Sequence, residues 1–114
     1  MSEAQTDYAQ AVKWDLLQWC YGNGLDLGCG DGRPHDWFHG IDSKAGTGSK
    51  GPHRIMDARD LSVFSDKSHD FIFSSFLLNE LIEGGEDPAK ILAEWWRVLK
   101  DDGYLILFLP LVED

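Results

Sequence analysis

Glycine is concentrated in one short stretch of the chain, GLDLGCGDGR, which spans Gly24–Arg33. The stretch opens like a short buried strand and then places glycines at Gly28, Gly30 and Gly32. Glycine has no Cβ and adopts positive φ freely, so such a loop presents bare main chain directly after a strand. The pattern therefore predicts a ligand that lies against the backbone at this strand end.

The length of the chain is typical of a single domain. It has 114 residues, of which 43% are hydrophobic and 26% charged. Single cores are commonest at about 100–150 residues, and this balance is ordinary for a globular protein. We find no composition shift that would mark a boundary, so we expect residues 1–114 to form one domain.

The charge of the chain argues against nucleic acid as a partner. The formal net charge is −10, and no run of Lys or Arg is present. A strongly acidic surface repels phosphate backbones, so we expect no nucleic-acid partner.

The two cysteines, Cys20 and Cys29, suggest free thiols in a reducing compartment, because they form neither a disulfide framework nor a metal-binding spacing.

The N-terminal MSEAQTDYAQ lacks the basic and apolar regions of a signal peptide. The longest apolar run, Leu105–Val112, is too short to span a bilayer. We expect a cytoplasmic protein with no metal and no membrane partner.

Helical and extended patterns alternate along the chain. Apolar segments at Gly24–Leu27, Phe38–Asp42, His53–Met56, Asp70–Ser74 and Tyr104–Leu109 predict five strands. Helices are predicted at Thr6–Tyr21, Phe76–Ile82 and Pro88–Lys100, the last with Asp87 as N-cap, and loops at Arg33–Trp37 and Ser43–Pro52. Alternation of this kind predicts an α/β fold, an open and mostly parallel five-stranded sheet with helices on both faces. Its ligands bind at the carboxyl ends of the strands.

Two classes of ligand use glycine loops after a first strand. Dinucleotide sites require G-x-G-x-x-G and a following helix that receives the pyrophosphate. Here the position of the third glycine holds Arg33, and Pro34 follows at once. A nicotinamide-dependent oxidoreductase is therefore disfavoured.

The ordered motifs resemble the class I, Rossmann-like, S-adenosylmethionine-dependent methyltransferases. The segments that carry the resemblance are LDLGCGDG (Leu25–Gly32), GID (Gly40–Asp42), MDARDL (Met56–Leu61), HDFIFSSFLLNEL (His69–Leu81) and EWWRVLKDDGYLILFLP (Glu94–Pro110). Each motif is weak alone, but all five occur in the family's order.

The resemblance implies S-adenosylmethionine as the cofactor and assigns roles to several residues. Asp42 would accept hydrogen bonds from the ribose hydroxyls. Asp57 would accept one from the adenine amino group, with the Ala58 amide near a ring nitrogen, although Asp57 also suits the start of a turn. Asp26 would lie near the methionine end. The full set of expected cofactor-binding residues is Asp26, Gly28, Cys29, Gly30, Asp42, Ser43, Asp57, Ala58, Ser74, Ser75 and Phe76.

Two departures from the family pattern limit what the resemblance implies. The segment SSFLLNEL lacks the histidines that many relatives carry after the fourth strand, so no catalytic base is assigned, and His35, Asp36 and His39 are not assigned that role either. The family's usual last two strands are also missing. The fifth strand, Tyr104–Leu109, would then be an open edge, and we expect a second copy or a partner protein to cover it.

The resemblance leaves two functions open. One is a methyltransferase that acts on a small-molecule or sugar-like acceptor. The other is an inactive methyltransferase-like domain that binds S-adenosylmethionine or a protein partner. Binding without turnover would distinguish the second from the first.

Overall fold

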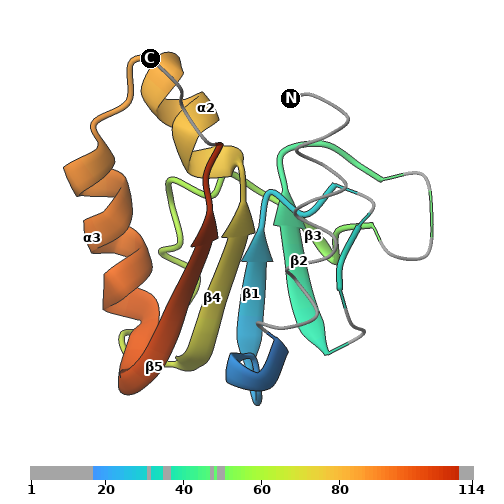
Figure 1. The fold of residues 1–114 in the computed structure, drawn as a ribbon, viewed down its shortest axis with the longest axis vertical. Coiled ribbons are helices and arrows are strands. Elements are labelled where there is room, and N and C mark those ends of the chain that lie inside the picture. Colours follow the sequence, from blue (N-terminus) through green and yellow to red (C-terminus); the bar gives the residue numbers. More distant parts are fainter. Residues whose placement is uncertain (1–16, 31, 35–36, 47, 49–50, 111–114) are drawn as a thin grey trace.

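A five-stranded sheet forms the centre of the computed structural model (Figure 1), which describes residues 17–30, 32–34, 37–46, 48 and 51–110. The strand order is β3-β2-β1-β4-β5, and all four pairings between these strands are parallel. The strands are β1 (Gly24–Leu27), β2 (Phe38–Asp42), β3 (Arg54–Ile55), β4 (His69–Ser75) and β5 (Leu99–Phe108). This arrangement confirms the predicted open α/β sheet.

The strand bounds agree with the sequence prediction to different degrees. β1 and β2 have the predicted bounds, while β3 is two residues long and β4 is longer by one residue at each end. The fifth strand was predicted too short, because Leu99 already pairs with His69. Pairing then continues at Phe71 with Tyr104, so residues 100–103 lie within an irregularity of the ladder.

Two α-helices follow β4. Helix α2 spans Leu77–Glu83 and helix α3 spans Pro88–Val98, two residues shorter than predicted because Leu99 is extended. The Asp87 side chain accepts a hydrogen bond from the Ala89 amide, which confirms Asp87 as the N-cap. The helix predicted at residues 6–21 falls mostly outside the described residues. Within its described end, Leu17–Trp19 form a 3-10 helix instead.

Both faces of the sheet are buried, as expected for parallel strands. One face carries Leu25, Leu27, Ile41 and Ile72, which pack against Ile91, Trp95 and Val98 of α3 and Leu78 of α2. The opposite face carries an aromatic cluster of Phe38, Phe71 and Phe73 with Cys20, close to the 3-10 helix. Each face thus has its own apolar core, and the central strand β1 lies between them.

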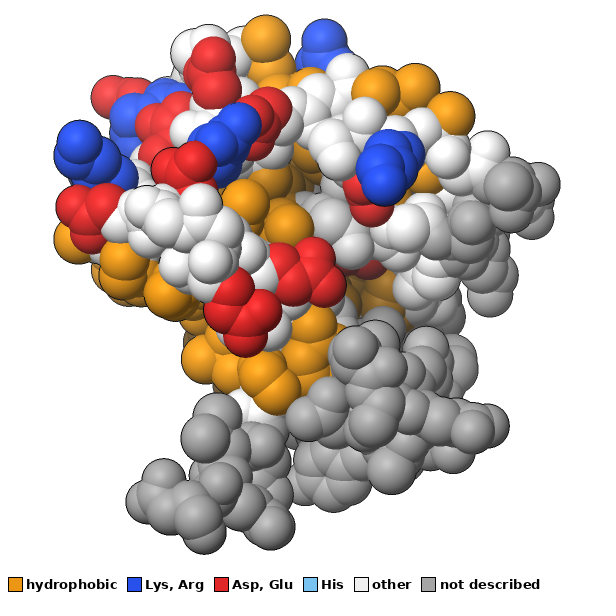
Figure 2. All heavy atoms as spheres, turned by 90° about the horizontal axis from the view of Figure 1, so that it is seen from above, with side chains coloured by type: hydrophobic (Ala, Val, Ile, Leu, Met, Phe, Trp, Pro, Cys, Tyr) orange, Lys and Arg blue, Asp and Glu red, His pale blue; other side chains and the backbone are white. Residues whose placement is uncertain are grey.

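The carboxyl ends of the strands point to the edge of the sheet where α2 begins (Figure 1). Viewed onto this edge, hydrophobic side chains lie in a hollow with acidic and basic side chains beside it (Figure 2). Among the residues that the structure describes, no helix is long and apolar enough to cross a membrane.

Candidate cofactor-binding site

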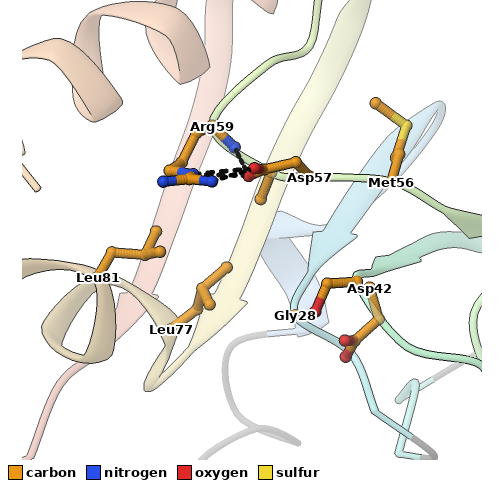
Figure 3. Close-up of a pocket in the computed structure, with 9 residues that line it drawn as sticks. Gly28, Asp42, Met56, Asp57, Arg59, Leu77 and Leu81 are labelled. Carbon is orange, nitrogen blue, oxygen red and sulfur yellow. Dashed lines mark hydrogen bonds and ion pairs between the residues drawn. The ribbon is translucent and has the colours of Figure 1, made fainter. Parts of the chain in front are cut away.

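A cavity of about 170 Å³ opens at the carboxyl edge of the sheet (Figure 3). It brings together residues from the ends of β1, β2 and β3 with two leucines of α2. Its lining consists of Gly28, Asp42, Ser43, Met56, Asp57, Ala58, Arg59, Leu77 and Leu81. Five of the expected cofactor-binding residues therefore line one cavity, namely Gly28, Asp42, Ser43, Asp57 and Ala58.

The main chain after β1 has the conformation for which glycine is suited. Gly28 has φ 73° and Gly30 has φ 54°, both in the left-handed region. A Cβ on Gly28 would approach the Leu77 Cβ to 3.1 Å, so a side chain at this position would crowd a leucine of the cavity lining. The amides of Gly28 and Cys29 both donate to the Ile41 carbonyl, at 2.8 and 3.2 Å. These bonds fix the loop against β2.

Asp42 ends β2 and holds the glycine loop in place. Its Oδ2 accepts a hydrogen bond from the Gly30 amide at 2.8 Å, and its Oδ1 accepts one from the Lys44 amide at 3.3 Å. Gly30 is thereby joined to the cavity through a residue that lines it. A carboxylate with two oxygens keeps acceptor capacity beyond these two amides.

Asp57 lies in a tight turn after β3 and is bound by Arg59. The Arg59 amide and Nε both lie 2.9 Å from Asp57 Oδ1, and Nη2 lies 2.5 Å from Oδ2. Hydrogen bonding to Arg59 lowers the pKa of the Asp57 carboxyl below its ordinary value, although desolvation opposes this. Arg59 Nη1 also donates to Glu86 Oε1, at the turn that joins α2 to α3.

Leucine side chains form the apolar side of the cavity. Leu77 and Leu81 point from α2 toward Asp57 and Arg59 (Figure 3). They are four residues apart and so lie on one face of the helix. Met56, just before Asp57, also lines the cavity. This combination of apolar walls with a few convergent polar groups is typical of small-molecule sites.

Three expected residues of the first motif, Asp26, Cys29 and Gly30, do not line the cavity, and Gly30 reaches it only through its bond to Asp42. Asp26 is buried within β1, with 2% of its surface exposed. Its position in the ladder places it opposite Phe73, on the side of the aromatic cluster. Cys29 packs toward Gly40, because a Cβ there would lie 2.8 Å from the Cys29 sulfur. Burial, with a contribution from Asp26, raises the pKa of the Cys29 thiol to about 12.

The expected residues at the end of β4 also lie outside the cavity lining. Ser74 is buried, and its hydroxyl donates to the Leu27 carbonyl at 2.9 Å. Ser75 pairs with Phe108 of β5. Phe76 has φ 65°, a strained conformation for a bulky residue, and its amide donates to the Phe108 carbonyl at 2.8 Å. Their assignment to the cofactor stays a prediction.

Sequence reasoning missed four residues that line the cavity: Met56, Arg59, Leu77 and Leu81. The leucines carried a usable signal in their spacing on α2, next to the expected turn. Arg59 carried none, because nothing local shows that its side chain reaches Glu86. Of the residues considered as bases, His35 and Asp36 lie outside the described residues, and His39 does not line the cavity.

The fold and the cavity together define a Rossmann-like α/β domain with a ligand site at the carboxyl edge of its sheet. A family model described as "Methyltransferase domain" matches residues 25–107. The chain therefore belongs to this methyltransferase family, which confirms the resemblance carried by the five motifs.

Individual relatives are longer than this chain. Uncharacterized protein MJ1123 of Methanocaldococcus jannaschii is 34% identical over 94 residues, which cover 75% of this chain and 43% of that protein. A SAM-dependent methyltransferase of Thermotoga maritima, described as a possible histamine N-methyltransferase, matches with a TM-score of 0.58 and 22% identity. That match covers 90% of this chain and 58% of the other, and at this identity it shows the fold. The chain thus spans about half the length of these two relatives.

Proposed function

We propose that this chain binds S-adenosylmethionine at the cavity and serves methyl transfer to a small-molecule or sugar-like acceptor. Membership of the methyltransferase family supports the cofactor and the type of reaction. One structural observation carries the proposal. Gly28, Asp42 and Asp57 lie at or just after the carboxyl ends of three neighbouring strands and line one cavity.

The cavity fits part of the cofactor. Its volume of about 170 Å³ is below the roughly 300–1,000 Å³ of complete ligand pockets, which suits the adenosine end alone. The glycine backbone permits close approach, and Asp42 supplies acceptors for ribose hydroxyls. Asp57 faces the cavity between apolar side chains, where an adenine amino group would find its acceptor.

S-adenosylmethionine brings the reactive methyl group, so the protein contributes binding and position. In this proposal Asp42 binds the ribose, while Leu77 and Leu81 keep water from the base. A proton acceptor is needed only where the methyl acceptor must lose a proton. The acidic charge of the chain favours an acceptor other than nucleic acid.

Calorimetry with S-adenosylmethionine, S-adenosylhomocysteine and NAD tests the cofactor class. We expect binding of the two adenosyl sulfur compounds and no binding of NAD. Asp42→Ala should weaken the binding of S-adenosylhomocysteine roughly 10- to 100-fold, because hydrogen bonds to a charged acceptor contribute about 1.5–3 kcal/mol. Asp102→Ala removes an exposed carboxylate of β5 outside the cavity and serves as the matched control. Equal affinity of wild type and Asp42→Ala would overturn the ribose assignment.

A second candidate is a domain that binds the cofactor or a protein without catalysis. It is favoured by the described residues that line the cavity, none of which is a histidine, lysine, cysteine or tyrosine. Turnover of S-adenosylmethionine with a panel of small amines, alcohols and sugars separates the two candidates. Product formation supports the enzyme, whereas tight binding with no turnover supports the second candidate.

A further inference from the structure

The Asp57 carboxylate already accepts hydrogen bonds from three N–H groups in this structure. Arg59 supplies three N–H groups to it: its own amide to Oδ1, its Nε to both oxygens at 2.9 Å, and its Nη2 to Oδ2 at 2.5 Å. A carboxylate offers about four acceptor positions, so little capacity remains for another donor. An adenine amino group and the Arg59 guanidinium therefore compete for the same two oxygens.

Arg59 has a second acidic partner outside this competition. Its Nη1 donates to Glu86, which follows α2 and lies 27 residues further along the chain. Glu86 is held by its own amide, which donates to the Leu81 carbonyl at 3.0 Å. The guanidinium can thus give up Asp57 and still keep an ion pair with Glu86.

The contact between Arg59 and Asp57 is exposed enough to be displaced. Each of the two side chains has 47% of its surface accessible. Water screens both charges at this exposure, so even this bidentate pair contributes only modestly to stability. A ligand that brings its own donor needs to overcome only this weak pair.

We propose that Arg59 is a specificity-determining residue that occupies Asp57 until the 6-amino group of an adenosyl ligand replaces it, whereupon Arg59 is retained by Glu86. This inference rests on the proposed function, because it concerns the same adenosine pocket. It assigns opposite roles to the two partners of Arg59. Asp57 is the position for which it competes with the ligand, and Glu86 is the position to which it withdraws.

Calorimetric titration with S-adenosylhomocysteine tests the inference with two variants. Arg59→Gln removes the competitor and should tighten binding about two- to fivefold, the range that an exposed ion pair allows. Glu86→Gln removes the alternative partner and should weaken binding by a similar factor. Non-specific damage to the pocket would weaken both variants, so the opposite signs are the informative result.

S-inosylhomocysteine, in which a carbonyl replaces the 6-amino group, provides the second measurement. Arg59→Gln should change its affinity less than twofold, because this analogue brings no amino donor to Asp57. The ratio of adenosyl to inosyl affinity should therefore rise in Arg59→Gln. Lys67→Gln removes the same charge from another exposed ion pair, Lys67–Asp101, which lies outside the cavity lining, and should leave both affinities unchanged.

The outcomes separate this inference from the proposed function. If wild type binds S-adenosylhomocysteine and Arg59→Gln binds it equally well or more weakly, the competition is overturned. The proposed cofactor site is then unaffected. Tightening of both analogues by equal factors overturns the role of the amino group. Absence of binding by wild type and by every variant overturns the proposed function and this inference together.

Discussion

The indole Nε1 of Trp95 donates a hydrogen bond to the Ala58 carbonyl at 2.9 Å, which joins helix α3 to the turn that carries Asp57 and Arg59. The Trp95 side chain is fully buried in the core on that face of the sheet. Its neighbour Glu94 accepts a hydrogen bond from the Leu61 amide at 2.8 Å. The last turns of α3 thus support one wall of the cavity from behind.

Trp95→Phe should reduce both stability and ligand binding. The change removes the bond to Ala58 and leaves space in a buried position, so we expect a loss of about 1–3 kcal/mol in the free energy of unfolding. Urea denaturation and S-adenosylhomocysteine titration measure the two effects. Trp96→Phe, on the exposed side of the same helix, is the control and should change neither. Equal loss in both variants would contradict the role of the Trp95 bond.

Alanine at the two left-handed glycines should have unequal effects. Gly28→Ala combines an unfavourable φ with a contact of 3.1 Å to Leu77, whereas a Cβ on Gly30 meets nothing within 4 Å. The conformational cost is about 1–2 kcal/mol at either position. Gly28→Ala should therefore destabilise the protein more, and it should also displace a leucine that lines the cavity. Thermal unfolding of both variants measures the two losses of stability. A larger loss in Gly30→Ala than in Gly28→Ala would contradict the prediction.

Stability should fall on mild acidification because of two histidines. Burial lowers the pKa of His39 and of His69. The neighbouring positive charges of His53 and Arg54 lower the pKa of His39 further. The unfolded chain, with pKa values near 6.5, then binds more protons than the folded one. The free energy of unfolding should be constant above about pH 6.5 and decrease below it, by at most about 1.4 kcal/mol per pH unit for each imidazole.

Urea denaturation at pH 7.5, 6.5 and 5.5 measures this slope before the carboxylates with lowered pKa begin to titrate. His39→Phe keeps the aromatic contact with Phe64 and should flatten the slope. An unchanged slope in that variant would show that His39 is not one of the groups involved.

We predict that two copies of the chain associate through the outer edge of β5. β5 ends the described strand order, and its segment 104–108 reads Tyr-Leu-Ile-Leu-Phe. Antiparallel pairing of two copies about Ile106 would place Tyr104 opposite Phe108 and leave Asp101 and Asp102 outside the apolar contact. Such an isologous contact is the simplest way to cover an exposed edge.

Sedimentation velocity over a range of concentrations tests the association. We expect a dimer in wild type and a monomer in Tyr104→Lys, which places a charge at the exposed edge. Circular dichroism verifies that this variant keeps its fold. A wild type that stays monomeric at high concentration would contradict the prediction.

Local signals in the sequence were sufficient for most of the sheet and for part of the site. β1 has its predicted bounds because glycines lie at its start and directly after its end, and β2 ends as predicted at the acidic Asp42. Gly28, Asp42 and Asp57 could be placed together because parallel strands bring their carboxyl ends to one edge. The sequence could not show that Leu99 leaves the helix to pair with His69, since this depends on a distant strand.

The side-chain contacts that complete the site were also beyond local patterns. Asp57 was expected to be available to a ligand, yet Arg59 occupies it, and Glu86 holds Arg59 from a turn far along the chain. Cys29 adjoins the glycines in sequence but packs toward Gly40, away from the cavity lining. Adjacency along the chain indicated the loop but not the direction of each side chain.

The bond between Trp95 and Ala58 has a consequence for the order of events during synthesis. The ribosome releases the glycine loop, Asp42 and Asp57 long before the last turns of α3 emerge. The wall that carries Asp57 gains its support only when Trp95 can reach it. A nascent chain that ends before α3 should therefore be unable to retain an adenosyl ligand, so retention of such a ligand would report that synthesis has passed this helix.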